Sequence, residues 1–273
     1  MIPRPDPPRS PAELVAHLRA GGPALVAMSG GVDSSLVASL AQEALGDSAL
    51  AVTLAGPAVA RSELDRARRV AEAIGIRHRV ADADPLKVAA YRANDADRCY
   101  HCRVVETGEL RSVGASVGVR QYVDGVHLDD LGDDRPGLRA MDAAGFTHPL
   151  VWAGWGKTEV RAEARKRALP NWDQPSDACL SSRVAHGDPI SADLLARIER
   201  AEEAVRAEGF RRVRVRVRGG AARVEVDPEE VGRLSTEPLA SRVVAEVARH
   251  GFAPVTIDPR GYASADRQLP VLR

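Results

Sequence analysis

Short apolar runs alternate with longer segments of helical period through the first 170 residues of the chain. The runs have the length of buried strands, and we expect strands at 24–28, 49–54, 76–80 and 121–124. The periodic segments between them predict helices at 11–20, 36–45, 62–74, 85–91, 102–117 and from 158 to shortly before 170. Elements that alternate in this way predict an α/β fold, in which a parallel sheet has helices on both faces.

The pattern changes beyond residue 170. No period is visible at 171–189, which we interpret as a linker. After a predicted helix at 193–208, valine and arginine alternate strictly over 211–218, and a Gly-Gly hairpin turn leads to a return strand at 222–227. Helices near 228–234 and 238–250 and a strand at 254–258 complete a small α+β domain. We therefore predict a first domain at 1–170, a linker at 171–189 and a second domain at 190–273.

A glycine-rich loop, Ser29-Gly-Gly-Val-Asp-Ser-Ser35, connects the first predicted strand to the next helix. Paired glycines let the backbone approach an anion closely, and the first N–H groups of a helix point at it. A Gly-Gly turn with a Ser or Asp helix cap and no ligand is the plainer interpretation. The loop lacks the lysine of the GxxxxGK[ST] nucleotide loop and the spacing of the GxGxxG fingerprint. The candidate phosphate-binding residues are Ser29, Gly30, Gly31, Asp33, Ser34 and Ser35.

Composition excludes several classes of partner. Basic and acidic residues balance, 38 against 38, so no overall field attracts the chain to nucleic acid or to a membrane. No apolar run has the length of a membrane span, and residues 1–10 lack the apolar core of a signal peptide. The three cysteines are an odd number, which favours thiol or metal chemistry in a reducing cytoplasm over a disulfide framework.

The cysteines admit several chemistries. Cys99 and Cys102 form a CxxC pair, and Cys179 lies in the predicted linker. Zinc is the usual occupant of such a pair, but a structural zinc site needs a fourth ligand, here His101 or His186. A redox CxxC normally follows the first strand of a thioredoxin-like unit, and this pair does not. Three cysteines also suit an iron–sulfur cluster whose open iron carries an exchangeable sulfide, and three unrelated buried thiols are the plainest alternative.

Other charged residues are candidates for anion or metal chemistry. An acidic loop from Asp129 to Asp134 follows a predicted strand end, so it is either a solvated turn or a site that binds Mg²⁺ or orients substrate. Lys157 stands just ahead of a helix, where it either reaches a phosphate or faces solvent. The arginines of 212–218 either pair with carboxylates in water or bind a polyanionic small molecule. Nucleic-acid binding would bring interleaved aromatic residues, which this strand lacks.

The loop at 29–34 resembles the SGGxDS loop of the ATP pyrophosphatases, or PP-loop enzymes, which bind the β- and γ-phosphates of ATP, adenylylate a substrate oxygen and release pyrophosphate. From about residue 25 to residue 262 the chain resembles the LarE-type ATP-dependent sulfur transferases, which help to build the nickel-pincer nucleotide cofactor of lactate racemase. Besides the loop, the motifs that carry this resemblance are Arg98-Cys-Tyr-His-Cys-Arg103, Asp129-Asp-Leu-Gly132 with Arg135-Pro-Gly137, Ala178-Cys-Leu-Ser-Ser-Arg183 and the arginine hairpin.

The resemblance implies a reaction. ATP adenylylates a carboxylate of pyridinium-3,5-dicarboxylic acid mononucleotide, a sulfur nucleophile displaces AMP, and repetition on the second carboxylate gives the dithio product. Some relatives take the sulfur from the cysteine at the position of Cys179, which becomes dehydroalanine, and others hold a [4Fe-4S] cluster with an extra sulfide on three cysteines. Because Cys99, Cys102 and Cys179 fill all three positions, we favour the cluster. Relatives also suggest a hexamer.

The same resemblance implies roles for individual residues. Mg²⁺ on the polyphosphate would be assisted by Asp33 or the Asp129 loop. The chain departs from the family at Val126-His127, where Thr-Asn is expected after Asp-Gly. The predicted catalytic residues are Cys179, Ser182, Arg183 and Asp33. The predicted nucleotide- and substrate-binding residues are Ser29, Gly30, Gly31, Asp33, Ser34, Ser35, Asp129, Lys157, Arg214 and Arg216. The predicted metal ligands are Cys99, Cys102, Cys179, Glu202 and Glu225.

Three alternatives compete with this prediction: a PP-loop enzyme that thiolates tRNA, an amide synthetase that uses ammonia, and a zinc-stabilised nucleotide-binding regulator without turnover. Thiolation of tRNA predicts tight, salt-dependent RNA binding, which the balanced charge does not favour. An amide synthetase would need no set of cysteines. Pyrophosphate release, assayed with and without the pyridinium mononucleotide, separates these alternatives.

Overall fold

The computed structural model describes residues 8–131, 136–175 and 178–262 of the chain. The chain divides into two compact units, Met1–Pro85 with Cys99–Asp177, and Leu86–Arg98 with Ala178–Arg273. The change of unit after Asp177 falls inside the predicted linker, and the predicted domain limits stay a prediction. Residues 132–135 and 176–177, which include part of the acidic loop and of the linker, lie outside the described residues. No helix in the described parts of the chain is long and apolar enough to cross a membrane.

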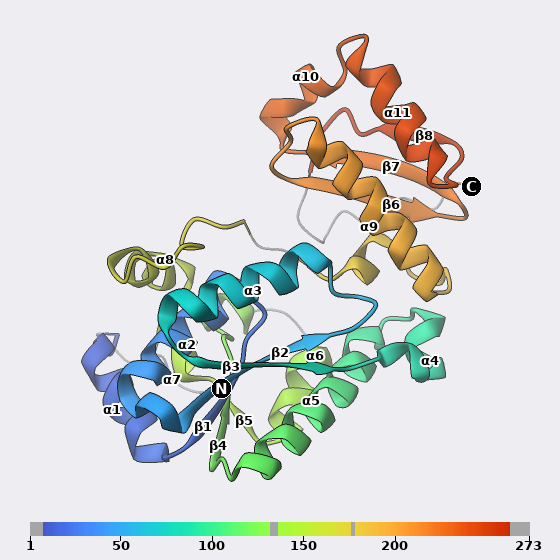
Figure 1. The fold of residues 1–273 in the computed structure, drawn as a ribbon. Coiled ribbons are helices and arrows are strands. Elements are labelled where there is room, and N and C mark those ends of the chain that lie inside the picture. The colour runs from blue at the N-terminus through green and yellow to red at the C-terminus, as the bar shows by residue number, and fades with distance from the viewer. Residues whose placement is uncertain (1–7, 132–135, 176–177, 263–273) are drawn as a thin grey trace. The chain divides into compact units, whose positions relative to one another are not determined.

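In the described part of the first unit, five strands form one parallel sheet in the order β3-β2-β1-β4-β5 (Figure 1). Ala24 of β1 pairs with Ala49 of β2 on one side and with Gln121 of β4 on the other, so β1 is central. The predicted parallel sheet is confirmed. Its strands are β1 Ala24–Ala27, β2 Ala49–Ala55, β3 Arg77–Asp82, β4 Gln121–Val123 and β5 Phe146–Thr147.

Helices cover both faces of this sheet. Val26 belongs to a core cluster with residues of α1, α2 and α8, whereas the adjacent Leu25 belongs to a second cluster with Leu110 and Val113 of α5. Successive strand residues point to opposite faces, so the two clusters lie on the two sides of the sheet. The helices of this unit are α1 Pro11–Gly21, α2 Val32–Leu45, η1 Gly46–Ser48, α3 Arg61–Ile74, α5 Arg98–Val117, η3 Leu128–Asp130, α6 Pro136–Ala143, α7 Pro149–Ala153 and α8 Lys157–Lys166.

The second unit contains a smaller mixed sheet in the order β6-β7-β8. β6 (Val213–Arg218) and β7 (Ala221–Val226) form the predicted antiparallel hairpin, and β8 (Val255–Ile257) adds in parallel to β7. The segment 86–98, which the sequence pattern did not assign to this unit, belongs to it. Helical segments of the unit are η2 Pro85–Lys87, α4 Ala89–Ala93, η4 Leu180–Arg183, α9 Ala192–Ala207, η5 Pro228–Glu230, α10 Val231–Leu234 and α11 Leu239–Arg249.

The burial of the hairpin side chains differs from what the alternation of valine and arginine predicts. The sequence pattern predicts one apolar and one charged face, yet Arg214 and Glu225 on the charged side are only 3% exposed. The segment after η4 lies along the edge of β6, where Val184 forms a β-bridge with Val217. The Arg216 guanidinium also donates to the Ser182 carbonyl at 3.3 Å. The charged face is therefore covered by the chain itself, and its ion pairs form away from water.

Candidate functional site

The glycine-rich loop between β1 and α2 has the geometry of an anion-binding turn. Gly30 has a φ of +79°, and a Cβ there would lie 2.9 Å from the main-chain nitrogen of Ala67, so only glycine fits. Gly31 is the N-cap of the 14-residue helix α2, and no described side chain caps it. The first N–H groups of the helix therefore form a positively polarised mouth at the place where the sequence predicts a phosphate.

The serines of this loop lie on different sides of it. Ser29 is exposed, and its hydroxyl accepts a hydrogen bond from the main-chain nitrogen of Gly31 at 3.2 Å. Ser34 accepts from the main-chain nitrogen of Ser29 at 3.1 Å and donates to the Gly31 carbonyl at 3.2 Å. Ser35 is 0% exposed, and its hydroxyl donates to the same carbonyl at 2.8 Å. Ser29 thus borders the mouth, whereas Ser35 supports the loop from inside.

The loop lies where the order of the strands reverses. β2 pairs with one side of β1 and β4 pairs with the other, and such a switch point opens a crevice beyond the carboxyl ends of the two strands. Gly125, two residues after β4, approaches the start of α2 so closely that a Cβ there would lie 2.5 Å from the main-chain nitrogen of Ser34. The segment that leads to the acidic loop therefore lies against the glycine-rich loop at 29–35, which we call the phosphate loop.

Lys157, the first residue of α8, joins two of the predicted acidic residues. Its Nζ lies 2.7 Å from both carboxylate oxygens of Asp33, and its main-chain nitrogen donates to Asp129 Oδ2 at 2.7 Å. The buried His127 has its Nε2 3.8 Å from Asp33 Oδ1 and 3.5 Å from Asp130 Oδ2. The structure therefore brings Asp33, Asp129 and Lys157 together, with His127 as a neighbour that sequence reasoning did not select.

Asn171 is a second residue at the loop that the sequence pattern did not indicate. It opens the stretch predicted as a linker, yet it is 3% exposed and lies against the phosphate loop. Its Nδ2 lies 2.9 Å from the Gly30 carbonyl and 2.9 Å from Ser35 Oγ. No local signal predicts these contacts, because they join residues about 140 positions apart.

A charge cluster begins at the buried Asp124, directly after β4, and ends at the exposed Asp142. His148 has Nδ1 2.8 Å from Asp124 Oδ1 and Nε2 2.8 Å from Asp142 Oδ1. Burial disfavours the imidazolium, but the hydrogen bonds and charges of Asp124 and Asp142 outweigh it and raise the pKa of His148 to about 9. His148 is therefore positively charged at neutral pH.

The second unit contains a pocket of about 120 Å³ with an unusual lining. Five arginines of the described chain face it, and none of its described lining residues is acidic. Guanidinium groups donate in a planar fork that matches phosphate and carboxylate oxygens, so the pocket suits an anion. The arginines are Arg98, Arg183, Arg214, Arg216 and Arg218, and Ala178, Ser182 and Tyr262 line the same pocket.

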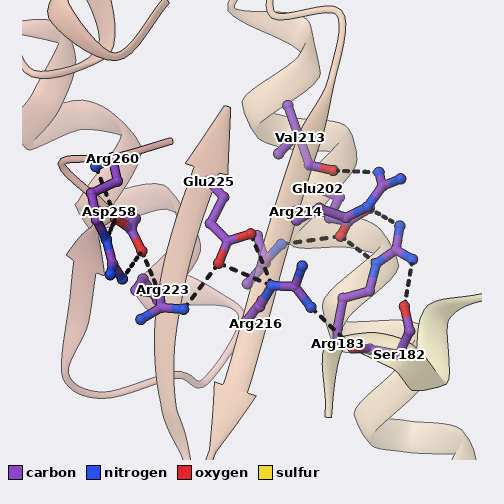
Figure 2. A network of polar contacts seen from close by, with 11 residues as sticks. Ser182, Arg183, Glu202, Val213, Arg214, Arg216, Arg223, Glu225, Asp258 and Arg260 are labelled. Atoms are coloured by element: carbon purple, nitrogen blue, oxygen red, sulfur yellow. Dashed lines mark hydrogen bonds and ion pairs between the residues drawn. The ribbon is translucent and has the colours of Figure 1, made fainter. Parts of the chain in front are cut away.

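Buried carboxylates hold Arg183 and Arg216 of this pocket in place (Figure 2). Glu202, 0% exposed, receives hydrogen bonds from the Arg183 guanidinium at 2.8 and 3.1 Å. Arg206 donates to Glu202 as well, at 2.7 Å. Burial favours the neutral acid, but Arg183, Arg214 and Arg206 outweigh this and lower the pKa of Glu202. Glu202 is therefore an ionised partner of arginines in this structure.

A second row of alternating charges crosses the sheet from β8 to the pocket. Asp258 Oδ2 lies 3.2 Å from Arg223 Nε, and Arg223 Nη2 donates to Glu225 at 3.1 Å. Glu225 in turn accepts from Arg216 Nε at 2.8 and 2.9 Å, as Figure 2 shows. Glu225, like Glu202, is thus engaged with guanidinium groups, and the role of either as a metal ligand stays a prediction.

The three cysteines are divided between the units. Cys99 and Cys102 begin α5 in the first unit, where Cys102 Sγ donates to Glu106 Oε1 at 3.3 Å. Cys179 immediately precedes η4 in the second unit, and its carbonyl accepts from Arg183 Nη1 at 3.0 Å. Nowhere in residues 8–131, 136–175 and 178–262 are three or more Cys, His, Asp or Glu side chains grouped to hold a metal ion. The iron–sulfur cluster stays a prediction.

A comparison with known protein families supports the interpretation of the glycine-rich loop and of the fold. A family model described as asparagine synthase matches residues 12–103, which include the phosphate loop. Together with the five-stranded parallel sheet and the loop at the switch point, this match places the chain in the PP-loop ATP pyrophosphatase superfamily.

Individual relatives narrow the class. Pyridinium-3,5-bisthiocarboxylic acid mononucleotide synthase of Lactiplantibacillus plantarum is 33% identical over 254 residues, which cover 93% of this chain and 91% of that protein. The chain therefore belongs to the LarE-type family of that synthase. Uncharacterized protein slr1717 of Synechocystis is 38% identical over 241 residues, 88% of this chain and 90% of its own length. A tRNA-specific 2-thiouridylase of Acidiphilium cryptum is 29% identical over 207 residues, 61% of this chain and 60% of its own.

Proposed function

We propose that the chain is an ATP-dependent sulfur transferase that adenylylates the carboxylates of pyridinium-3,5-dicarboxylic acid mononucleotide and converts them to thiocarboxylates, with release of AMP and pyrophosphate. The substrate class follows from the relative of Lactiplantibacillus plantarum, whose name describes the bisthiocarboxylic product. The chain acts in the cytoplasm as a homo-oligomer, and the family resemblance suggests a hexamer.

One observation supports the proposed substrate and sulfur donor, and not only the use of ATP. The arginine-lined pocket includes Ala178 and Ser182, which flank the segment of Cys179. Arg183 lines this pocket and donates to the Cys179 carbonyl, so it fixes the backbone of the candidate sulfur donor beside an anion site. A mononucleotide with two carboxylates has the phosphate and carboxylate oxygens that such a pocket binds. Ser182, Arg183, Arg214 and Arg216 would hold these oxygens.

The residues of the first unit serve activation of the carboxylate. The N-terminal amides of α2 and Ser29 bind the polyphosphate of ATP. Lys157 contacts Asp33 of the loop and so lies close enough to neutralise part of the charge of the polyphosphate. Asp33 and Asp129 offer hard oxygen ligands, and Mg²⁺ usually takes one or two carboxylates together with substrate phosphates, so these residues fit the ion. When bound, Mg²⁺ offsets the negative charge that develops on the departing pyrophosphate.

Sulfur transfer then needs a nucleophile. In the direct route, the Cys179 thiolate attacks the acyl-adenylate carbon, a C–S bond forms, and AMP leaves with the electron pair of the C–O bond. A base then removes the Cα proton of Cys179, the Cβ–S bond breaks towards sulfur, and dehydroalanine remains. The alternative donor is a sulfide on a [4Fe-4S] cluster bound by Cys99, Cys102 and Cys179. Anaerobic reconstitution with iron and sulfide, followed by electron paramagnetic resonance, tests that alternative.

The deciding experiment measures pyrophosphate release with ATP alone, with ATP and the pyridinium mononucleotide, and with ATP and bulk tRNA. We expect release only with the mononucleotide. Release that needs tRNA would instead favour the thiouridylase function of the more distant relatives.

Two variants sharpen this experiment. Cys179→Ser should still release pyrophosphate with the mononucleotide but form no thiocarboxylate, because adenylylation precedes sulfur attack. Arg216→Gln should raise the KM for the mononucleotide about tenfold or more, because it removes a charged hydrogen-bond donor from the pocket. Arg211→Gln is the matched control, since Arg211 is an exposed arginine ahead of the same strand, and we expect it to leave the KM unchanged.

A further inference from the structure

The phosphate loop is held from inside by one amide side chain of a distant segment. Asn171 Nδ2 lies 2.9 Å from the Gly30 carbonyl oxygen and 2.9 Å from Ser35 Oγ. The side chain belongs to a residue that is 3% exposed, and both bonds are buried. Arg66 Nε adds a longer contact of 3.2 Å to the same Gly30 carbonyl.

The hydrogen-bond pattern fixes which end of the amide faces the loop. The Gly30 carbonyl is an acceptor only, so its partner must be the NH₂ group of Asn171. Ser35 donates its own proton to the Gly31 carbonyl at 2.8 Å, and its oxygen is therefore left to accept the second proton of that NH₂ group. Asn171 thus acts as a double donor at this position.

The direction of the Gly30 carbonyl decides what the loop offers to an anion. In a trans peptide the C=O and the following N–H point in opposite directions, so a carbonyl held inward turns the Gly31 N–H outward. That N–H reaches the exposed hydroxyl of Ser29, at the mouth of the loop. Because both residues of this peptide are glycines, the peptide can flip at little steric cost, and a flip would present an oxygen to the phosphate.

We propose that Asn171 is a positioning residue that prevents this flip and so keeps the phosphate loop in its anion-binding form. The inference rests on the proposed function only in taking ATP as the ligand of the loop. Asn171 does not touch the nucleotide in this account. It acts through the Gly30 peptide and through Ser35.

The test compares the native chain with three variants by calorimetric titration with ATP and by thermal unfolding. Asn171→Ala removes the two donors, and we expect ATP to bind about tenfold more weakly. Asn171→Asp keeps the size of the side chain but sets a carboxylate oxygen against the Gly30 carbonyl, so we expect a larger loss than in the alanine variant. A KM for ATP that rises more than kcat falls would locate the defect in phosphate binding.

Gln121→Ala is the matched control in the same unit. Gln121 Nε2 also bridges two main-chain carbonyls, those of Leu18 and Gly22, at 2.7 Å each. It begins β4, at the end of the sheet away from the phosphate loop. We expect Gln121→Ala to lower the melting temperature while ATP affinity stays unchanged.

Two results would overturn the proposal. One is a folded Asn171→Asp protein that binds ATP as the native chain does, and the other is an equal loss of ATP affinity in Gln121→Ala. The titration needs no second substrate. If the mononucleotide assay fails while the ATP titrations follow the expected order, the substrate assignment is refuted and the role of Asn171 stands.

Discussion

The two candidate anion sites of this molecule are built from different chemical groups. In the first unit, the phosphate loop offers main-chain N–H groups of α2, and its shape depends on glycines that admit no side chain, Gly30 and Gly125. In the second unit, arginine side chains line the pocket, and buried carboxylates such as Glu202 and Glu225 hold them. One site is set by backbone geometry, the other by charge.

This difference determines how each site should fail. A backbone site is sensitive to volume, because an added methyl group displaces the loop itself. A charge site is sensitive to unbalanced charge, because buried guanidinium groups lose their partners when a carboxylate is removed. A mutation of each kind at its own site, beside a control in the same unit, therefore tests the comparison.

Removal of the Glu202 carboxylate should have the largest effect. Arg183 is 2% exposed and Arg214 is 3% exposed, so Glu202→Gln leaves buried positive charge without its partner. We expect the free energy of unfolding of the second unit to fall by about 3–5 kcal/mol. Hydrogen exchange resolved by segment, with urea as denaturant, should show the loss in α9 and β6 while α2 keeps its protection.

The control for Glu202 is a surface pair in the same unit. Glu230 lies 3.2 Å from Arg233, which is 47% exposed, and exposed ion pairs contribute only about 0–1 kcal/mol. Glu230→Gln should therefore change little. Equal effects of the two substitutions would contradict the view that the second site depends on buried charge.

The next largest effect concerns volume at the phosphate loop. In Gly125→Ala, the new Cβ would lie 2.5 Å from the main-chain nitrogen of Ser34 and 2.8 Å from the carbonyl carbon of Asp33. Backbone has to move, so we expect ATP to bind at least about tenfold more weakly and stability to fall by about 1–3 kcal/mol. Isothermal titration and urea denaturation measure the two quantities.

Gly108→Ala provides the contrast. Gly108 lies in α5 with no atom within 4 Å of the added Cβ. Alanine is the better helix former by about 1 kcal/mol, so this variant should be as stable as the native chain or more stable, with native ATP affinity. If Gly125→Ala behaved in the same way, the backbone account of the first site would be wrong.

The parts of the fold that sequence predicted are those with local signals. Alternating apolar runs and periodic segments predicted the strands β1 to β4 and the helices between them, and the hexapeptide at 29–34 located the phosphate loop. β5 was not predicted, because Phe146–Thr147 is too short to show a period. Alternation along β6 predicted that its arginines share a face, but alternation does not tell what covers that face, so their pairing with carboxylates and their binding of an anion were both left open.

The parts of the site that sequence missed depend on contacts between distant segments. Asn171 and His127 carry no recognisable motif, and their contacts with Gly30 and Asp33 exist only after β1, β4 and α8 have come together. Segment 86–98 joins the second unit through pairs such as Asn94 with the Ala185 carbonyl at 2.8 Å, which no local pattern indicates.

The smallest predicted effect concerns charge in the first unit, in the ion cluster of His148 with Asp124 and Asp142. The folded pKa of His148, about 9, exceeds the ordinary value of 6.5, so protonated His148 stabilises the fold below pH 6.5 and this stability is lost as the pH rises towards 9. His148→Gln should therefore lower the free energy of unfolding by about 2 kcal/mol at pH 6 and by much less at pH 10. Urea denaturation at both pH values checks this. A loss of equal size at the two pH values would mean that His148 contributes packing and not charge.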